Sequence, residues 1–244
     1  MLLRAGHPAL AAQQTTANLR ICEANGWNED VARCHLLLAS SALAGGRLDD
    51  AEAETILAEP VFHSGQMLRE LAQLNVIAGQ VALARGQADE GVRRATGALA
   101  LAQPRGMRLI HNDALVLRGQ ARLLEASPRG DAKGGACAPT DPLFRALDDA
   151  EEGWRIAREC GYRWGERGAL FLQAGIHIAL SVAYGAVDGN EGIVTRHRAD
   201  AQRARQEAEA LAARLRLTED ELAEADARAA ECLVEWNAKA AADR

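Results

Sequence analysis

The chain has 244 residues, a formal net charge of -6 and a pI near 5.6, which argues against a global electrostatic attraction to nucleic acid or to anionic lipid. Hydrophobic residues make up 48% of the chain but aromatic residues only 4%, so the apolar mass is mostly Ala and Leu, which favour helices over strands. We therefore expect an all-α protein, and one elongated domain over residues 1–244 suffices because helical-repeat arrays grow by adding units.

Cysteine usage and the N-terminus bear on the cellular compartment. The five cysteines show no CxxC spacing, so they predict neither a disulfide framework nor a zinc site. The N-terminal apolar run is too short for a secretory signal. Both features favour a reducing, cytoplasmic location. The cysteines are Cys22, Cys34, Cys137, Cys160 and Cys232.

The first expected helix, residues 8–25, resembles the second helix of a repeat unit whose first helix is missing. Helical solenoids normally cover their ends with polar caps. An unpaired helix at this end leads us to expect either further repeats upstream in a longer protein or a partner docked on this face.

An internal repeat follows, with a period of about 40 residues, which is in the range of helical solenoids. A shift by one period aligns Met67 with Met107, Val76 with Val116, Gly79-Gln80 with Gly119-Gln120 and Leu83 with Leu123, and a backward shift places Gly79 on Ala39. The next small residue in a similar context is Gly175, which lies more than one period after Gly119. The excess matches the length of the Gly/Pro-rich stretch 127–142, which predicts a mobile inserted loop.

Turn and capping residues divide the repeats into helix pairs. Gly45-Gly46 and Gly86 suit the ends of first helices, and acidic residues follow each of these turns, at the positive end of the next helix. Residues 218–221 form a capping box that predicts a last helix. The predicted organisation is repeats at 26–65, 66–106, 107–161 and 162–217, then a capping helix at 218–240.

The uncharged run 169–187 is long enough to approach a membrane span. Gln173 and His177 interrupt it, and its position matches the buried first helix of the last unit. We therefore predict a core helix of a soluble domain and no membrane partner.

Small residues seven apart in the second helices complete the pattern: Ala51 and Ala58, Gly91 and Ala98, Ala150 and Ala157. Segments 39–52, 79–91 and 150–167 resemble tetratricopeptide repeats. The period near 40 and the run Arg-Glu-Cys-Gly-Tyr-Arg-Trp-Gly-Glu at 158–166 resemble the sensor arrays of bacterial STAND signalling NTPases. The resemblance implies a right-handed superhelical solenoid of antiparallel helix pairs, with about four repeats.

The sequence carries none of the common catalytic motifs. It lacks GxxxxGK[ST], GxSxG, HExxH and an EF-hand loop, so we predict no enzyme activity and no cofactor. Cys34 and His35 are adjacent, and adjacent helical residues point about 100° apart, which prevents a hydrogen-bonded catalytic pair. His177 is predicted to be a core or groove histidine, with a ligand role as the alternative. No metal site is predicted, because His63, His111 and His197 show no metal spacing.

The family resemblance implies that first helices line a concave groove for a protein or peptide ligand. Counting from the small residue of each unit, the candidate partner-binding positions are Arg33, Leu36, Ser40, Gln73, Val76, Gln80, Asp113, Val116, Gln120, Leu172 and Ile176. Gln80 and Gln120 are expected to stack, and their amides suit the backbone of an extended peptide. The competing interpretation is that these surfaces are polar only for solubility.

An arginine-rich strip near the C-terminus offers a non-protein alternative. It comprises Arg196, Arg198, Arg203, Arg205, Arg214 and Arg216. Asp200, Glu207 and Glu209 interleave at helical spacings, which favours a solvated, ion-paired face over a phosphate-binding one.

Three functional classes follow from these patterns. The first is a sensor or scaffold region that binds a protein ligand within a bacterial signalling protein of the STAND NTPase kind. The second is a free-standing adaptor that bridges two proteins. The third is a regulatory array that binds nucleic acid or a small ligand. No sequence feature fixes an oligomeric state.

Overall fold

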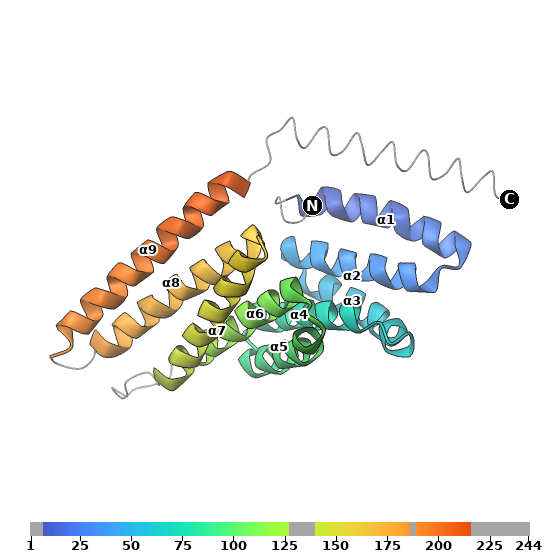
Figure 1. Cartoon of the computed structure of the whole chain (residues 1–244). Coiled ribbons are helices and arrows are strands. Elements are labelled where there is room, and N and C mark those ends of the chain that lie inside the picture. The colour runs from blue at the N-terminus through green and yellow to red at the C-terminus, as the bar shows by residue number, and fades with distance from the viewer. Residues whose placement is uncertain (1–6, 127–139, 186–188, 216–244) are drawn as a thin grey trace.

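The structure is a computed structural model that describes residues 7–126, 140–185 and 189–215. Within these ranges the chain forms nine α-helices and one short 3-10 helix, with no strand (Figure 1). The all-α prediction is confirmed. The predicted capping helix at 218–240 lies outside the described residues.

The helices follow one another along the array as antiparallel neighbours (Figure 1). Each packs on the next, and the first helices of the units also contact one another in series: α2 with α4, α4 with α6, and α6 with α8. The bounds are α1 (Pro8–Asn25), α2 (Asn28–Ala44), α3 (Leu48–Ser64), α4 (Leu68–Ala84), α5 (Ala88–Ala102), the 3-10 helix η1 (Gln103–Arg105), α6 (Arg108–Ala126), α7 (Thr140–Glu159), α8 (Arg163–Gly185) and α9 (Glu191–Leu215).

One kind of turn ends most of these helices. A residue in the left-handed conformation follows the helix, and the next N–H reaches back to a carbonyl five residues earlier, as in the Schellman motif. The left-handed glycines have φ of 64 to 75° at Gly26, Gly46, Gly86, Gly106 and Gly161. The reaching bonds include Arg47 N–H to Ala42 O at 2.9 Å and Tyr162 N–H to Ala157 O at 2.7 Å.

This turn spaces the helices evenly along the chain. The helices α1 to α6 begin at residues 8, 28, 48, 68, 88 and 108. Each repeat of about 40 residues in the sequence therefore consists of two helix–turn units of equal length. The first and the second helix of a repeat bury different side chains.

Gln66 occupies the left-handed position of the α3–α4 turn with φ of 50°, where the equivalent turns have glycine. A Cβ in this conformation costs about 1 kcal/mol. We expect Gln66→Gly to raise the midpoint of thermal unfolding by about 2–4 °C, measured by circular dichroism.

Gly46→Gln is the matched control for Gln66→Gly. A Cβ added at Gly46 meets nothing within 4 Å, so backbone strain is the only cost expected of this substitution. The midpoint of thermal unfolding of Gly46→Gln should therefore fall by an amount similar to the rise in Gln66→Gly. Unchanged midpoints in both variants would show that these turns store no strain.

Small residues allow the first helices to approach one another. A Cβ added at Gly79 would lie 2.6 Å from Cδ2 of Leu117, and one added at Gly119 would lie 2.6 Å from Cδ2 of Leu172. Such distances are far below van der Waals contact, so glycine is required unless the leucine moves. The predicted small residues of the second helices are also buried: Ala51, Ala58, Gly91, Ala98, Ala150 and Ala157.

These contacts correct the register of the last unit. Leu172 takes in α8 the place that Leu117 takes in α6, and the two leucines are as far apart in the sequence as the starts of α6 and α8. The small residue equivalent to Gly119 is therefore the buried Ala174. The predicted equivalence with Gly175 is wrong by one residue, because alanine serves at this position as well as glycine.

The boundary of the predicted insertion also changes. Residues 140–142, predicted as the end of the loop 127–142, form the first turn of α7. Residues 127–139 lie outside the described part of the chain.

Among the described helices, α8 alone is long and apolar enough to cross a membrane, with a mean hydropathy of 1.4 over its apolar window. It packs on α6, α7 and α9. On one face Leu172, Ile176 and Leu180 join a core cluster with residues of α7, as the sequence predicts for a core helix.

A buried carboxylate joins α6 to α7. Asp149 accepts hydrogen bonds from Arg118 at 2.7 and 3.0 Å and from Arg122 at 2.6 Å, and Asp149 is 4% exposed. Both arginines are partly exposed, so they keep some access to water.

We expect Asp149→Ala to lower the free energy of unfolding by about 2 kcal/mol, since it leaves two guanidinium groups beside an apolar interface. Urea denaturation measures the change. The neighbouring Asp148 is exposed, and Asp148→Ala should change stability by less than about 0.5 kcal/mol. Equal losses in the two variants would contradict a role for the ion pair.

Candidate functional site

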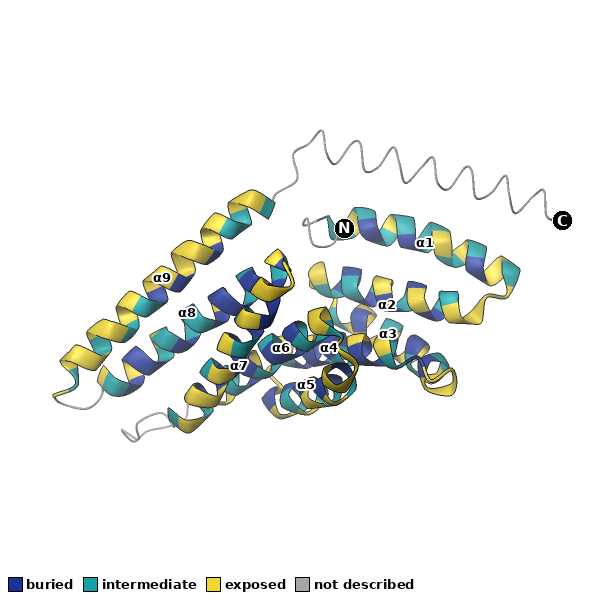
Figure 2. Cartoon of the chain, in the orientation of Figure 1, coloured by how far each residue is buried: buried dark blue, intermediate teal, exposed yellow. Residues whose placement is uncertain are grey.

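The predicted partner-binding positions divide by burial. Arg33, Gln73, Gln80 and Gln120 are exposed, and Ser40, Asp113 and Val116 are partly exposed. Four predicted contact residues lie in the core instead: Leu36 at 4%, Val76 at 6%, Leu172 at 4% and Ile176 at 0% exposure. Figure 2 shows exposed and buried residues alternating along the helices that carry these residues.

Helix geometry explains the buried positions. A residue three before the small residue lies only about 60° from it around the helix, whereas residues six before or one after lie about 100–120° away. Leu36 and Val76 are at the first kind of position, so they share the packed face. Leu172 and Ile176 were placed by the incorrect register, and they correspond to Leu117 and Ala121, which are buried too.

The remaining polar residues of the first helices form what we call the first-helix surface: Arg33, Ser40, Gln73, Gln80, Asp113 and Gln120. Arg33 is ion-paired with Asp30 at 2.8 Å and with Glu70 of the next first helix at 3.2 Å. Asp113 accepts a hydrogen bond from the Tyr162 hydroxyl at 3.2 Å. The three glutamine side chains extend to solvent from α4 and α6.

An apolar stripe on α8 has an origin in the repeat. In α6, Val116 and Leu123 pack into the core cluster that includes α8. The offset along the sequence that relates Leu117 in α6 to Leu172 in α8 also relates Val116 to Phe171 and Leu123 to Ile178. Phe171 and Ile178 are 38% and 53% exposed. No first helix follows α8 in the described part of the chain, so the face that joins one unit to the next is open there.

A second candidate site lies between α7, α8 and α9. It is a cleft of about 790 Å³ whose lining includes Trp154, His177, His197 and Asp200, and we call it the histidine cleft. The Nδ1 atoms of His177 and His197 are 3.1 Å apart, and the two rings stack with centroids 5.2 Å apart. Tyr184 stacks on His197 at 5.7 Å.

The histidine cleft gathers titratable and polar groups from α7, α8 and α9. Burial lowers the pKa of His177, an effect that Asp200 opposes. One potential ligand atom from each of His177, His197 and Asp200 lies within 4.8 Å of the other two. The buried indole Nε1 of Trp154 has no hydrogen-bond partner among the described residues.

The histidine cleft brings His177 and His197 together, a pairing that the sequence analysis did not predict. Spacing along one helix could not reveal it, because the two histidines come from different helices. His177 lies eight residues before the end of α8, and His197 lies six residues after the start of α9. Two residues at similar distances from the turn of a helical hairpin lie at similar heights on its two helices. This similarity is the feature of the sequence from which the pairing of the two histidines could have been predicted.

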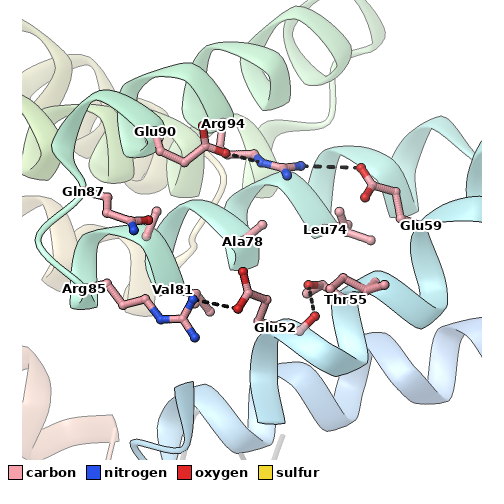
Figure 3. A pocket seen from close by; sticks show the side chains of 12 residues that line it. Glu52, Thr55, Glu59, Leu74, Ala78, Val81, Arg85, Gln87, Glu90 and Arg94 are labelled. Carbon is pink, nitrogen blue, oxygen red and sulfur yellow. Dashed lines mark hydrogen bonds and ion pairs between the residues drawn. The ribbon is translucent and has the colours of Figure 1, made fainter. Parts of the chain in front are cut away.

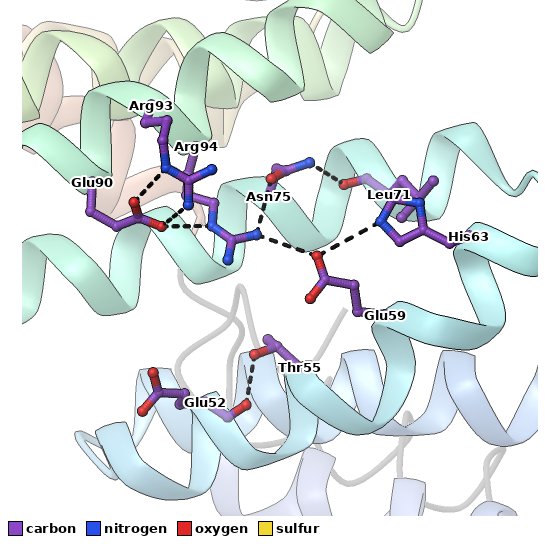
Figure 4. A network of polar contacts seen from close by, with 9 residues as sticks. All are labelled: Glu52, Thr55, Glu59, His63, Leu71, Asn75, Glu90, Arg93 and Arg94. Atoms are coloured by element: carbon purple, nitrogen blue, oxygen red, sulfur yellow. Dashed lines mark hydrogen bonds and ion pairs between the residues drawn. The ribbon is translucent and has the colours of Figure 1, made fainter.

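A smaller pocket of about 90 Å³ lies among α3, α4 and α5 (Figure 3). Its charges neutralise one another: Arg85 binds Glu52 at 2.7 Å, and Arg94 binds Glu90 at 2.9 Å. Figure 4 shows Arg94 reaching both Glu90 on its own helix and Glu59 on α3, at 3.5 Å. The Arg94–Glu59 pair connects the second helices α3 and α5, and the Arg85–Glu52 pair connects the end of α4 to α3.

Cys34 and His35 have separate surroundings in the structure. The Nδ1 atom of His35 lies 2.6 Å from a carboxylate oxygen of Glu54 on α3. Burial raises the pKa of the Cys34 thiol to about 12, with a further contribution from Cys22, so the thiol stays protonated at neutral pH.

The arginine-rich strip is partly ion-paired along α9. Arg203 pairs with Asp200, and Arg205 pairs with Glu209 at 2.8 Å. Arg216 lies outside the described residues. The run 158–166, which carries the narrower resemblance, forms the α7–α8 turn, where a Cβ added at Gly165 would overlap Asn112 and the Tyr162 ring.

Comparison of the chain with protein-family models, with curated proteins and with solved structures returns no match. The candidate sites therefore stand on their geometry.

Proposed function

We propose that the chain is a helical-repeat module that binds a protein or peptide through the first-helix surface. The observation that carries the proposal is the set of exposed glutamines Gln73, Gln80 and Gln120 on neighbouring helices. Gln80 and Gln120 occupy the same position of successive repeat units, so their amides recur along the array.

Side-chain amides fit an extended backbone because each both donates and accepts hydrogen bonds. Packed helices are about 8–10 Å apart, so amides on successive first helices can bind peptide groups several residues apart in a ligand. The buried Leu36 and Val76 pack α2 and α4 into the core, and a surface that is ordered before binding loses less entropy on binding.

The broader role that we propose is a ligand sensor or scaffold of a cytoplasmic bacterial signalling protein, in a right-handed solenoid of the tetratricopeptide type. The recurrent helix pairs and buried small residues support the repeat type. The resemblance to sensor arrays of STAND NTPases supports the signalling role.

An adaptor that bridges two proteins is the second candidate. The apolar stripe of Phe171, Ile178 and Val182 on α8 favours it, because a stripe of large side chains is a different chemical surface from the glutamines of α4 and α6. A regulatory nucleic-acid array is less well supported, since carboxylates on the same helix neutralise Arg203 and Arg205.

The test is capture of partners from the native cell by the full chain, followed by affinity measurement with the purified partner. We expect the triple variant Gln73→Ala, Gln80→Ala, Gln120→Ala to weaken binding at least about tenfold, because several amide contacts of about 1 kcal/mol are lost together.

A matched control removes glutamines from a different face. Gln202 and Gln206 are exposed on α9, and Gln202→Ala, Gln206→Ala should leave the affinity unchanged. Full affinity in the triple variant would exclude the first-helix surface as the binding site, and loss only in a Phe171→Ser, Ile178→Ser variant would favour the α8 stripe instead.

A further inference from the structure

We propose that His177, His197 and Asp200 form a binding site for a divalent transition-metal ion of the Zn²⁺ type. The three side chains come from two helices that meet in the histidine cleft, and their potential ligand atoms lie within 4.8 Å of one another. Two imidazole nitrogens and a carboxylate oxygen are a donor set that Zn²⁺ and related ions bind well.

The spacing of the nitrogens fits a shared ion. With Zn–N bonds of about 2.0–2.1 Å, two nitrogens on a tetrahedral ion are about 3.3 Å apart, and the Nδ1 atoms of His177 and His197 are 3.1 Å apart. Two imidazole lone pairs that face each other at this distance repel, and a cation bound between them removes that repulsion. A direct hydrogen bond between these atoms requires that just one of the two carries a proton.

Neighbouring groups hold the ligands in place. Tyr184 stacks on the His197 ring and fixes its plane. Arg203 pairs with Oδ1 of Asp200, which leaves the second carboxylate oxygen to bind the ion. Outer groups of this kind orient ligands and raise their affinity for a metal.

Three protein ligands leave a fourth position for oxygen. The cleft that holds them is lined by basic residues such as Arg196 and by the acidic Glu151 and Glu207, and its Arg155 is ion-paired with Glu152 and Glu159. Because these charges offset one another, a water molecule is the expected ligand in that position.

The site would fasten α9 to α8. In the described part of α9 the buried residues are three alanines, Ala201, Ala204 and Ala208, which bury little apolar area. An ion bound by His177 of α8 and by His197 and Asp200 of α9 adds a link to an interface that α9 makes with small side chains, so metal binding should stabilise the last helix pair.

The experiment uses the full chain freed of metal by chelation. Titration with ZnCl₂ in a calorimeter should give one ion per chain with a low-micromolar or tighter Kd, and Zn²⁺ should raise the thermal midpoint. Co²⁺ should give the visible absorption of a tetrahedral site without a thiolate-to-cobalt charge-transfer band, which separates this site from the cysteines.

The variants His177→Gln, His197→Gln and Asp200→Asn should each weaken Zn²⁺ binding at least tenfold. His63→Gln is the control, because His63 is exposed and pairs with Glu59 instead. Circular dichroism verifies that each variant is folded, and the Co²⁺ spectrum of the unaltered chain decides the ligand type even if a variant unfolds.

Three results would overturn the proposal. They are the absence of a one-to-one complex at Zn²⁺ concentrations far above micromolar, a cobalt spectrum with sulfur ligation, and equal losses in the His63 and His177 variants. None of these measurements involves the first-helix surface, so their failure is separate from failure of the proposed protein binding.

Discussion

The left-handed residue that ends most of the described helices is the constraint on which the array depends. It reverses the chain within a short turn, and the N–H that follows it satisfies a helix carbonyl that would otherwise be exposed. Because the turn recurs at a constant spacing from α1 to α6, these helices have nearly equal lengths. Equal helices bring corresponding side chains to the same height in successive units, so one packing arrangement can repeat.

Close packing of the first helices follows from that regularity. Gly79 and Gly119 each accept a leucine of the next first helix, which leaves no room for a side chain at the contact. The core is otherwise rich in alanine, and alanine buries little area per residue. Ion pairs of Asp149 and of Arg94 add connections between helices. In a protein with larger core side chains, apolar contacts would provide these connections.

The two candidate sites arise from different parts of this architecture. The first-helix surface lies within the regular repeats, so its residues recur at the repeat period and suit a ligand that extends along the array. The histidine cleft lies at the α8–α9 pair, where the helices are longer than elsewhere and the cleft stays open between them. A cleft made by one pair of helices suits a compact ligand such as an ion.

The sequence by itself determined the helical class, the repeat period and the small residues at its contacts, because helix propensity and glycine requirements act through local backbone geometry. Tertiary packing decided what lies on each face. Leu36 and Val76 are buried because a rotation of only about 60° separates them from the packed small residues, a difference that counting along the chain did not resolve. The stretch 127–142, predicted as an insertion, put the predicted register of α8 in error by one residue, which corresponds to a rotation of about 100° around the helix. The proximity of His177 and His197 depended on how α8 and α9 fold together, since no local spacing relates residues on two antiparallel helices until their turn is fixed.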